Sequence, residues 1–241
     1  MRLWWSIRKR LARLDRRPRV AERLGARWEL DPGDWLDLRL LAGQPFEAEQ
    51  RRRFDEMVAR ARPSRLYDVG ANFGLYSVTL GLAHPQLAIE AFEPVGATRA
   101  KLERNLGLNG LAERVRVHPL ALSETEGAAE IAIDPRSSGL STLSASADEA
   151  ARRDFARSET IRTARLDDLT SAAGETLAIK IDVEGHEAAA LRGMGRVLAE
   201  NRGVMMIETR ARNAPEVLAL LAEAGWRETG RVQEEIFLEK H

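Results

Sequence analysis

Residues 66–74 are Leu-Tyr-Asp-Val-Gly-Ala-Asn-Phe-Gly, a short apolar strand followed by a turn that contains two glycines. Leu75, Val78 and Leu82 follow at helical spacing, so a helix is predicted directly after the turn. The order strand, turn, helix then recurs, with further strands predicted over 88–92, 115–117, 177–183 and 204–207. This alternation predicts an α/β fold in which helices cover both faces of a parallel sheet.

Right-handed crossovers make such a domain Rossmann-like, and its ligands bind at the carboxyl ends of the strands. We assign residues 63–241 to this domain. Residues 123–165 interrupt the pattern with Gly, Pro, Ser and Thr, which predicts a hairpin-and-loop insertion that borders or covers the binding pocket. The tail, 226–240, is predicted to form two strands with a turn near Gly230.

Residues 1–62 are predicted to form a helical N-terminal extension. Its first part, 1–27, holds ten basic and two acidic residues and is therefore +8, whereas the whole chain has a net charge of zero. Apolar residues recur at helical spacing between these cations, which predicts a basic amphipathic helix that Pro18 interrupts or ends. A second helix is predicted over 47–61.

Composition excludes several classes of protein. The 241 residues are 44% hydrophobic and 31% charged, as in a globular protein, and include no Cys. Disulfide scaffolds, thiolate zinc sites and thiol nucleophiles are therefore excluded. No apolar run reaches the length of a membrane span, and Arg8-Lys9-Arg10 leaves no apolar segment for a signal peptide. We expect a cytoplasmic protein.

The first turn departs from the dinucleotide-binding pattern Gly-x-Gly-x-x-Gly, because Asn72 replaces the second glycine. That glycine lets the backbone approach a pyrophosphate, so NAD and FAD are disfavoured. Gly70 and Gly74 still allow close approach to a smaller ligand, and Asp68 offers a carboxylate suited to an ammonium group. The alternative is a plain turn in which Asp68 caps the helix.

Glu93 follows the second strand, 23 residues after Gly70, where an acid can accept hydrogen bonds from both ribose hydroxyls. Alone, it would be an acid placed favourably before a helix. A nucleoside with an amino acid and no pyrophosphate describes S-adenosylmethionine. The predicted cofactor-binding residues, including two near the adenine after the third strand, are Asp68, Gly70, Ala71, Asn72, Phe73, Gly74, Glu93, Pro94, Ala121 and Ser123.

Residues 180–187, at the carboxyl end of the fourth strand, are Lys-Ile-Asp-Val-Glu-Gly-His-Glu, and five of the eight can ionise. Lys180 and Asp182 share one face of a central strand, where unpaired charge is costly to bury, so a functional role is favoured. The alternative is an internal Lys–Asp ion pair with acids at the start of a helix, but it would explain only some of the five ionisable residues.

With these motifs in place, the chain resembles the FkbM-type methyltransferases over about residues 40–210. The matching segments, in the family's order, are 68–74, 90–94, 166–169, 180–187 and Ile207-Glu208, and Phe46-Glu47 resembles a short pattern upstream. The resemblance implies a class I methyltransferase fold with a mostly parallel seven-stranded sheet and S-adenosylmethionine as methyl donor. It also implies an acceptor hydroxyl on a sugar, glycolipid, polyketide or other secondary metabolite.

The predicted catalytic residues are Lys180, Asp182, Glu184 and His186. His186 is the favoured proton acceptor because the ordinary pKa of histidine lies near neutrality. Asp182 is the alternative acceptor, or it orients a substrate, and Lys180 would keep it ionised. Asp182, Glu184, His186 and Glu208 also resemble ligands of a divalent metal, but no tight spacing demands one, and we do not favour a metal.

The sequence is compatible with three functions for the whole chain. The favoured one is an O-methyltransferase acting on a small or lipid-linked hydroxyl compound. An RNA-directed methyltransferase or nucleic-acid-binding protein would use the basic segment, yet residues 28–241 are −8 and only 5% of residues are aromatic. A non-catalytic interaction protein is least favoured. For residues 1–27, a solvated helix or a contact in a homo-oligomer is favoured over a helix on a membrane surface.

Overall fold

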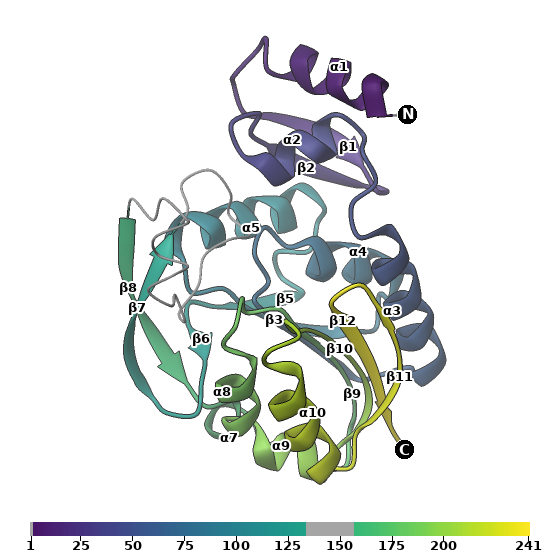
Figure 1. Cartoon of the computed structure of the whole chain (residues 1–241), viewed down its shortest axis with the longest axis vertical. Helices are drawn as coiled ribbons and strands as arrows, with labels where there is room; N and C mark the ends of the chain where they lie inside the picture. Colours follow the sequence, from purple (N-terminus) through teal and green to yellow (C-terminus); the bar gives the residue numbers. More distant parts are fainter. Residues whose placement is uncertain (1, 134–156) are drawn as a thin grey trace.

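The computed structural model describes residues 2–133 and 157–241. Its main sheet contains β3 (Arg65–Val69), β4 (Ala88–Phe92), β5 (Val115–His118), β9 (Thr176–Ile181), β10 (Arg202–Glu208), β11 (Arg227–Val232) and β12 (Glu235–Lys240). These seven strands lie in the order β11-β12-β10-β9-β3-β4-β5 (Figure 1). All neighbours from β10 to β5 are parallel, and β12 is antiparallel to both of its neighbours. The predicted mostly parallel, seven-stranded sheet is confirmed.

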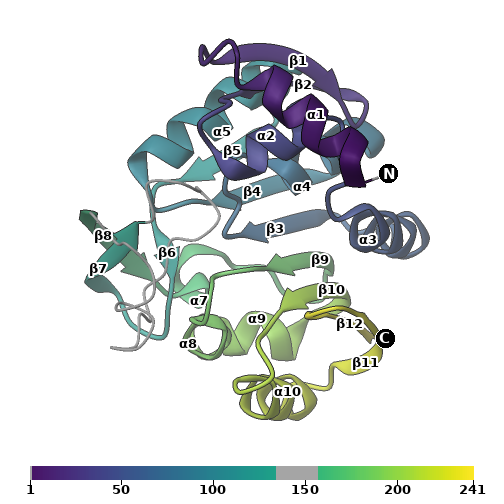
Figure 2. The same cartoon turned by 45° about the horizontal axis from the view of Figure 1, so that its top comes forward.

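Helices cover both faces of this sheet (Figure 2). One face carries α3 (Ala48–Ala61), α4 (Leu75–Ala83) and α5 (Gly96–Leu108), and the other carries α7 (Leu166–Leu169), α8 (Glu187–Arg192), α9 (Gly195–Glu200) and α10 (Ala214–Glu223). Each face of the sheet has its own hydrophobic core, and successive strand residues alternate between the two. Leu66 packs into the core beneath α3, α4 and α5, and Tyr67 packs into the core on the opposite face. This double burial explains why the central strands consist mostly of apolar residues in the sequence.

The chain order reverses at β3, which pairs with β9 on one side and β4 on the other. From β3 the strands proceed outward to β5 in one direction, whereas β9 and β10 extend in the other. Loops at the carboxyl ends of strands diverge at such a reversal and leave a crevice for ligands. The two motifs 68–74 and 180–187 meet at this point.

The N-terminal extension differs from our prediction, because it is not helical throughout. The helix α1 (Arg2–Ala12) ends before Pro18, and residues 19–30 form a hairpin of β1 (Arg19–Arg23) and β2 (Ala26–Leu30). The turn between the strands has Leu24 and Gly25 at φ 54° and 74°, the positive values that two-residue hairpins require. A further helix, α2 (Trp35–Leu41), follows with Asp34 as its N-cap.

This N-terminal unit shares a core with the sheet. Trp28 is fully buried, and its ring centroid lies 5.5 Å from that of Phe73 in the first turn. The side chain of Asn105 on α5 accepts a 2.8 Å hydrogen bond from the backbone N–H of Glu29, and Asn109 accepts one of 2.9 Å from Arg27. The boundary that we predicted at residue 62 therefore does not separate two cores.

The insertion contains the predicted hairpin. β7 (Gly127–Ile133) and β8 (Arg157–Ala164) are antiparallel, and the short β6 (Ala121–Leu122) completes a small sheet in the order β6-β8-β7. Residues 134–156, to which part of our prediction of a lid refers, lie outside the described residues.

The tail has the two predicted strands, but its turn is not at Gly230. The turn lies at Gln233 and Glu234, and Gly230 sits at a register shift within β11 instead. Among the helices of the described residues, none is both long and apolar enough to cross a bilayer.

Candidate active site

Two cavities open beside the carboxyl ends of β3 and β9, and three residues, Asn72, Asp182 and Glu184, line both of them. The first cavity, of about 630 Å³, is also lined by Gly70, Glu93, Ala121, Leu122, Ile131 and His186. The second cavity, of about 700 Å³, is also lined by Trp35, Phe46, Glu47, Tyr76, Lys180 and Glu208.

The predicted site residues are divided between these cavities. Pro94 joins Gly70, Glu93, Ala121 and His186 at the first cavity, whereas Ala71, Phe73 and Lys180 line the second. Asp68, Gly74 and Ser123 line neither. The structure therefore brings most of the predicted residues to one place, on two sides of a shared boundary.

The first turn is pressed against the loop that follows β9. Gly70 has φ 75°, and a Cβ at this position would lie only 1.9 Å from the carbonyl oxygen of Asp182. The backbone N–H of Asp182 in turn donates a 3.0 Å hydrogen bond to the carbonyl of Val69. Only glycine fits here, because both the positive φ and the close approach exclude a side chain.

Glu93 lies at the first cavity, where we predicted a ribose. Its carboxylate accepts 2.9 Å hydrogen bonds from the backbone N–H groups of Asn72 and Val95, which leaves further lone pairs on both oxygens. Burial raises the pKa of Glu93 to about 7, although these two backbone bonds act in the opposite direction. The contact with a ribose stays a prediction.

Asp68 has a different place from the one we expected. Its side chain is buried beneath the first turn, and Oδ2 accepts hydrogen bonds from the backbone N–H (3.0 Å) and hydroxyl (2.6 Å) of Ser77 on α4. Oδ1 lies 3.9 Å from Nζ of Lys180. Here the carboxylate anchors the start of α4, as in the alternative of a capping acid, and it lines neither cavity. Its contact with the ammonium group of a cofactor stays a prediction.

Lys180 connects the two motifs. Its ammonium group donates to the carbonyl of Gly70 at 2.9 Å and to Oδ2 of Asp182 at 3.4 Å. Burial lowers the pKa of Lys180, but the carboxylates of Asp182 and Asp68 outweigh that effect and raise it overall. The predicted Lys180–Asp182 pair is therefore present, and Lys180 also holds the first turn.

His186 lies on the first cavity, with Nε2 3.0 Å from the hydroxyl of Ser123. Burial lowers the pKa of its imidazole. His186 thus shares the first cavity with Ala121 and Leu122, where we predicted the adenine, and it does not line the second cavity. Its role as a proton acceptor stays a prediction.

A pair that we did not include among the site residues, a buried tyrosine and a half-buried glutamate, lines the second cavity. The hydroxyl of Tyr76 donates a 2.8 Å hydrogen bond to Oε2 of Glu47, which has the left-handed φ of 46° at the N-cap of α3. Burial and the neighbouring Asp182 raise the pKa of Glu47 to about 7. The resemblance of Phe46-Glu47 to an upstream family pattern was the signal in the sequence that could have identified it.

Three of the four residues that resemble metal ligands lie together. Carboxylate oxygens of Asp182, Glu184 and Glu208 lie within 4.8 Å of one another. Glu184 also forms a 2.8 Å ion pair with Arg210. The charge of Asp182, together with burial, raises the pKa of Glu208 far above its usual range. His186 is not part of this group of oxygens.

The segment 166–169 has a structural role. The two carboxylate oxygens of Asp167 accept 3.0 Å hydrogen bonds from the backbone N–H groups of Arg196 and Val197, at the start of α9. Asp167 thus satisfies two donors that the helix itself leaves free. This motif stabilises the fold beside β9 and lines neither cavity.

Known proteins resemble this chain in both fold and sequence. The solved structure of methyltransferase FkbM from Methylobacillus flagellatus KT superposes with a TM-score of 0.52 at 18% identity, covering 85% of this chain and 52% of that one. Its likeness, with the observed strand order, shows a class I methyltransferase fold.

Curated relatives match over shorter segments. Methyltransferase sdnD of Sordaria araneosa is 37% identical over 78 residues, which are 32% of this chain and 30% of that protein. The AMB antimetabolite synthetase AmbE of Pseudomonas aeruginosa is 37% identical over 90 residues, 37% of this chain but 4% of that protein. The chain thus spans less than a third of either relative. The model of the methyltransferase FkbM domain matches residues 68–228, which is well over half of the chain, and the protein belongs to this family.

Proposed function

We propose that the protein is an S-adenosylmethionine-dependent O-methyltransferase whose acceptor is a hydroxyl group of a sugar, glycolipid or secondary metabolite. One observation carries the proposal: two cavities share a boundary of Asn72, Asp182 and Glu184, and each has the lining that one of the two substrates requires. The family membership supports the same reaction class.

The first cavity fits the cofactor. Glu93 offers acceptors for ribose hydroxyls, and Ala121, Leu122 and Ile131 offer an apolar wall for a purine. The side-chain oxygen of Asn72 is buried and has no hydrogen-bond partner among the described residues, which suits an ammonium donor. S-adenosylmethionine, when bound, supplies a methyl group already activated by a positively charged sulfur.

The second cavity fits the acceptor. Trp35 and Phe46 give it apolar walls, and carboxyl groups at its base can hold hydroxyl groups. A hydroxyl must lose its proton as it is methylated, and a base works best when its pKa lies near the working pH. Glu47, with a pKa of about 7, meets this condition.

We assign the other residues around this base to positioning. Tyr76 orients Glu47 through its hydrogen bond. Asp182 is paired with Lys180 and lies at the boundary, where it can accept a hydrogen bond from the acceptor. His186 lies on the cofactor side, so we rank it behind Glu47 as the proton acceptor. The variants E47Q and H186A distinguish the two.

Calorimetry with S-adenosylmethionine and with S-adenosylhomocysteine tests the first half of the proposal. We expect micromolar binding to the wild-type chain and to E103Q, which changes an exposed acid on α5. E93Q should bind at least about tenfold more weakly, because a neutral amide replaces an acceptor of charge-assisted hydrogen bonds. Absence of binding by the folded wild-type chain would overturn the proposed function.

A further inference from the structure

Exposed hydrophobic side chains are concentrated in the N-terminal unit. Trp4, Ile7, Leu11 and Leu14 are 53%, 48%, 60% and 82% exposed. Their spacing of three and four residues puts them on one side of α1 and the turn after it. We call these four residues the apolar stripe. In the described residues after 35, the large exposed hydrophobics are Leu82 and Leu169, at 40% and 41%, and they are far apart in the sequence.

The stripe is not the face by which α1 packs on the protein. Ala12 is buried, Trp5 and Arg8 are half-buried, and α1 contacts α2 through this inner side. The stripe residues take the other side of the helix. Single exposed apolar residues are ordinary, but a row of four, including a tryptophan, along one helix and the turn after it indicates a surface that binds something apolar.

The charges around the stripe identify the partner. Residues 1–27 carry a net charge of +8, and Arg10, Arg13, Arg16 and Arg17 are exposed. The guanidinium of Arg8 lies 4.6 Å from the centre of the Trp4 ring, so a cation sits directly beside an apolar anchor. Tryptophan and leucine on one face with arginine around them is the arrangement that binds at the interface of an anionic bilayer.

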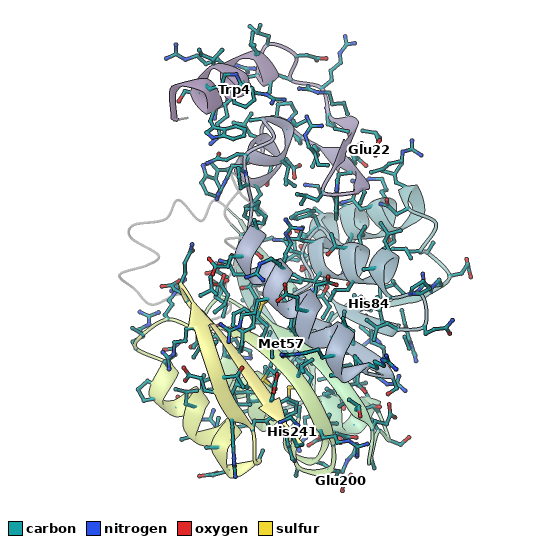
Figure 3. The ribbon with its side chains drawn as sticks, turned by 90° about the vertical axis from the view of Figure 1, so that its right-hand side faces the viewer. Trp4, Glu22, Met57, His84, Glu200 and His241 are labelled. Carbon is teal, nitrogen blue, oxygen red and sulfur yellow. The ribbon has the colours of Figure 1, made fainter. Side chains whose placement is uncertain are left out.

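The rest of the chain favours one orientation on such a surface. Residues 28–241 have a net charge of −8, so an anionic surface attracts the N-terminal unit and repels the rest. Figure 3 shows Trp4 at one end of the molecule and Glu200 and His241 at the other. The protein would therefore rest on α1, with the end that holds Glu200 and His241 in solution.

This orientation also concerns the second cavity. Trp35, at the start of α2, is 49% exposed and lines that cavity. In Figures 1 and 2, α2 lies between α1 and the main sheet. The helix that carries the stripe and the helix that carries a wall of the second cavity are thus direct neighbours.

We propose that the apolar stripe and its surrounding arginines dock the protein onto an anionic lipid surface, with α1 lying in the headgroup region. This goes beyond the proposed function, because docking requires neither cofactor nor acceptor. The stripe supplies the apolar contact, and the arginines supply attraction to the negatively charged headgroups.

Co-sedimentation of the full chain with vesicles tests this proposal. We expect binding to phosphatidylcholine vesicles that contain phosphatidylglycerol, and at least about tenfold weaker binding to phosphatidylcholine alone. I7S/L11S should lose about tenfold or more of the binding, because two apolar side chains no longer enter the interface. In R10Q/R13Q the affinity for the anionic vesicles should fall about fivefold for each charge removed. Added salt should weaken the binding of the wild type.

The control L82S/L169S removes two hydrophobic side chains of similar exposure elsewhere and should bind like the wild type. Thermal unfolding and calorimetry with S-adenosylmethionine check that every variant is folded, and docking is read without cofactor, so its failure is distinct from failure of the proposed function. No binding to anionic vesicles, or wild-type binding by I7S/L11S, overturns the proposal. The proposal is also overturned if sedimentation velocity shows a wild-type dimer that becomes a monomer in I7S/L11S. Binding to an RNA oligonucleotide without binding to vesicles overturns it as well.

Discussion

The hydroxyl of Tyr76 donates a 2.8 Å hydrogen bond to Oε2 of Glu47, and this bond joins the start of α4 to the N-cap of α3 at the wall of the second cavity. Burial is the main cause that raises the pKa of Glu47 to about 7, and the hydrogen bond from Tyr76 acts in the opposite direction. The pair therefore combines a base of nearly neutral pKa with a group that tunes it.

Replacing Glu47 with glutamine should lower kcat by about 10²- to 10⁴-fold, because it removes the proposed proton acceptor. In the wild type, the ionised base becomes available as pH rises through about 7, so turnover should rise over that interval and then level. E47Q should lose this limb of the profile and keep its affinity for the cofactor. E49Q, an exposed acid in the first turn of α3, is the control. A wild-type profile in E47Q, lost instead in H186A, would assign the proton transfer to His186.

Replacing Tyr76 with phenylalanine should move the same limb to higher pH. The hydrogen bond favours the ionised form of Glu47, so its removal lets burial raise the pKa further. At the plateau, turnover should fall much less than in E47Q. A pH–rate profile measured at saturating cofactor separates this tuning from a loss of binding, and an unshifted profile would show that Tyr76 does not act on the base.

Cofactor affinity should depend on the ionisation of Glu93. Its pKa of about 7 in the free protein means that about half of the molecules hold it protonated at neutral pH. If ribose hydroxyls bind the ionised form, affinity should be about tenfold stronger at pH 8 than at pH 6, with proton release on binding at the lower pH. Calorimetry in two buffers of different ionisation enthalpy measures both quantities. E93Q should show weak binding that no longer changes over this range.

Adding a methyl group at Gly70 should destabilise the protein. G70A combines a positive φ of 75° with a Cβ that would lie 1.9 Å from a backbone oxygen, so we expect a loss of about 3 kcal/mol or more of unfolding free energy. In G107A the new Cβ meets no atom within 4 Å, and alanine favours the helix, so this variant should gain up to about 1 kcal/mol. Urea titrations followed by circular dichroism compare the two, and equal stabilities would contradict the predicted close approach.

Chelation should leave turnover unchanged. Arg210 pairs with Glu184 and Lys180 pairs with Asp182, so two of the three neighbouring carboxyl groups already have a cationic partner without an ion. Activity is to be measured after dialysis against EDTA and again after adding magnesium. Loss with EDTA and recovery with magnesium would instead assign the Asp182-Glu184-Glu208 group to metal binding.

The central sheet could be predicted because its strands are buried on both faces, which produces short, mostly apolar segments such as those before Gly70 and Asp182. The N-terminal hairpin could not be separated from a helix in the same way. Its two strands have five residues each and carry several arginines, and the deciding features are the conformation of Leu24-Gly25 and the burial of Trp28. The burial of Trp28 depends on tertiary packing, because β2 packs against α5.

Site residues next to a strand were easier to predict than those brought in from elsewhere. Glu93 lies where the spacing from Gly70 placed it, at the first cavity. Asp68 is the second-to-last residue of β3, before the turn begins. The orientation of its side chain toward Ser77 depends on how α4 leaves that turn. Glu47 comes from a segment more than 20 residues before the first turn, so only the folded chain shows that it reaches the second cavity.

The contact between Trp28 and Phe73 has a consequence for how the molecule loses its structure. The family match begins at residue 68, but the hydrophobic core on that side of the sheet continues without a break through the hairpin, α2 and α3. Phe73 belongs to the turn after β3, and Trp28 belongs to a segment outside the match. We therefore expect the turn and the N-terminal residues that share this core to open together, which hydrogen exchange would measure. A shortened chain that begins at residue 68 would expose Phe73 and leave the turn without the packing that fixes it.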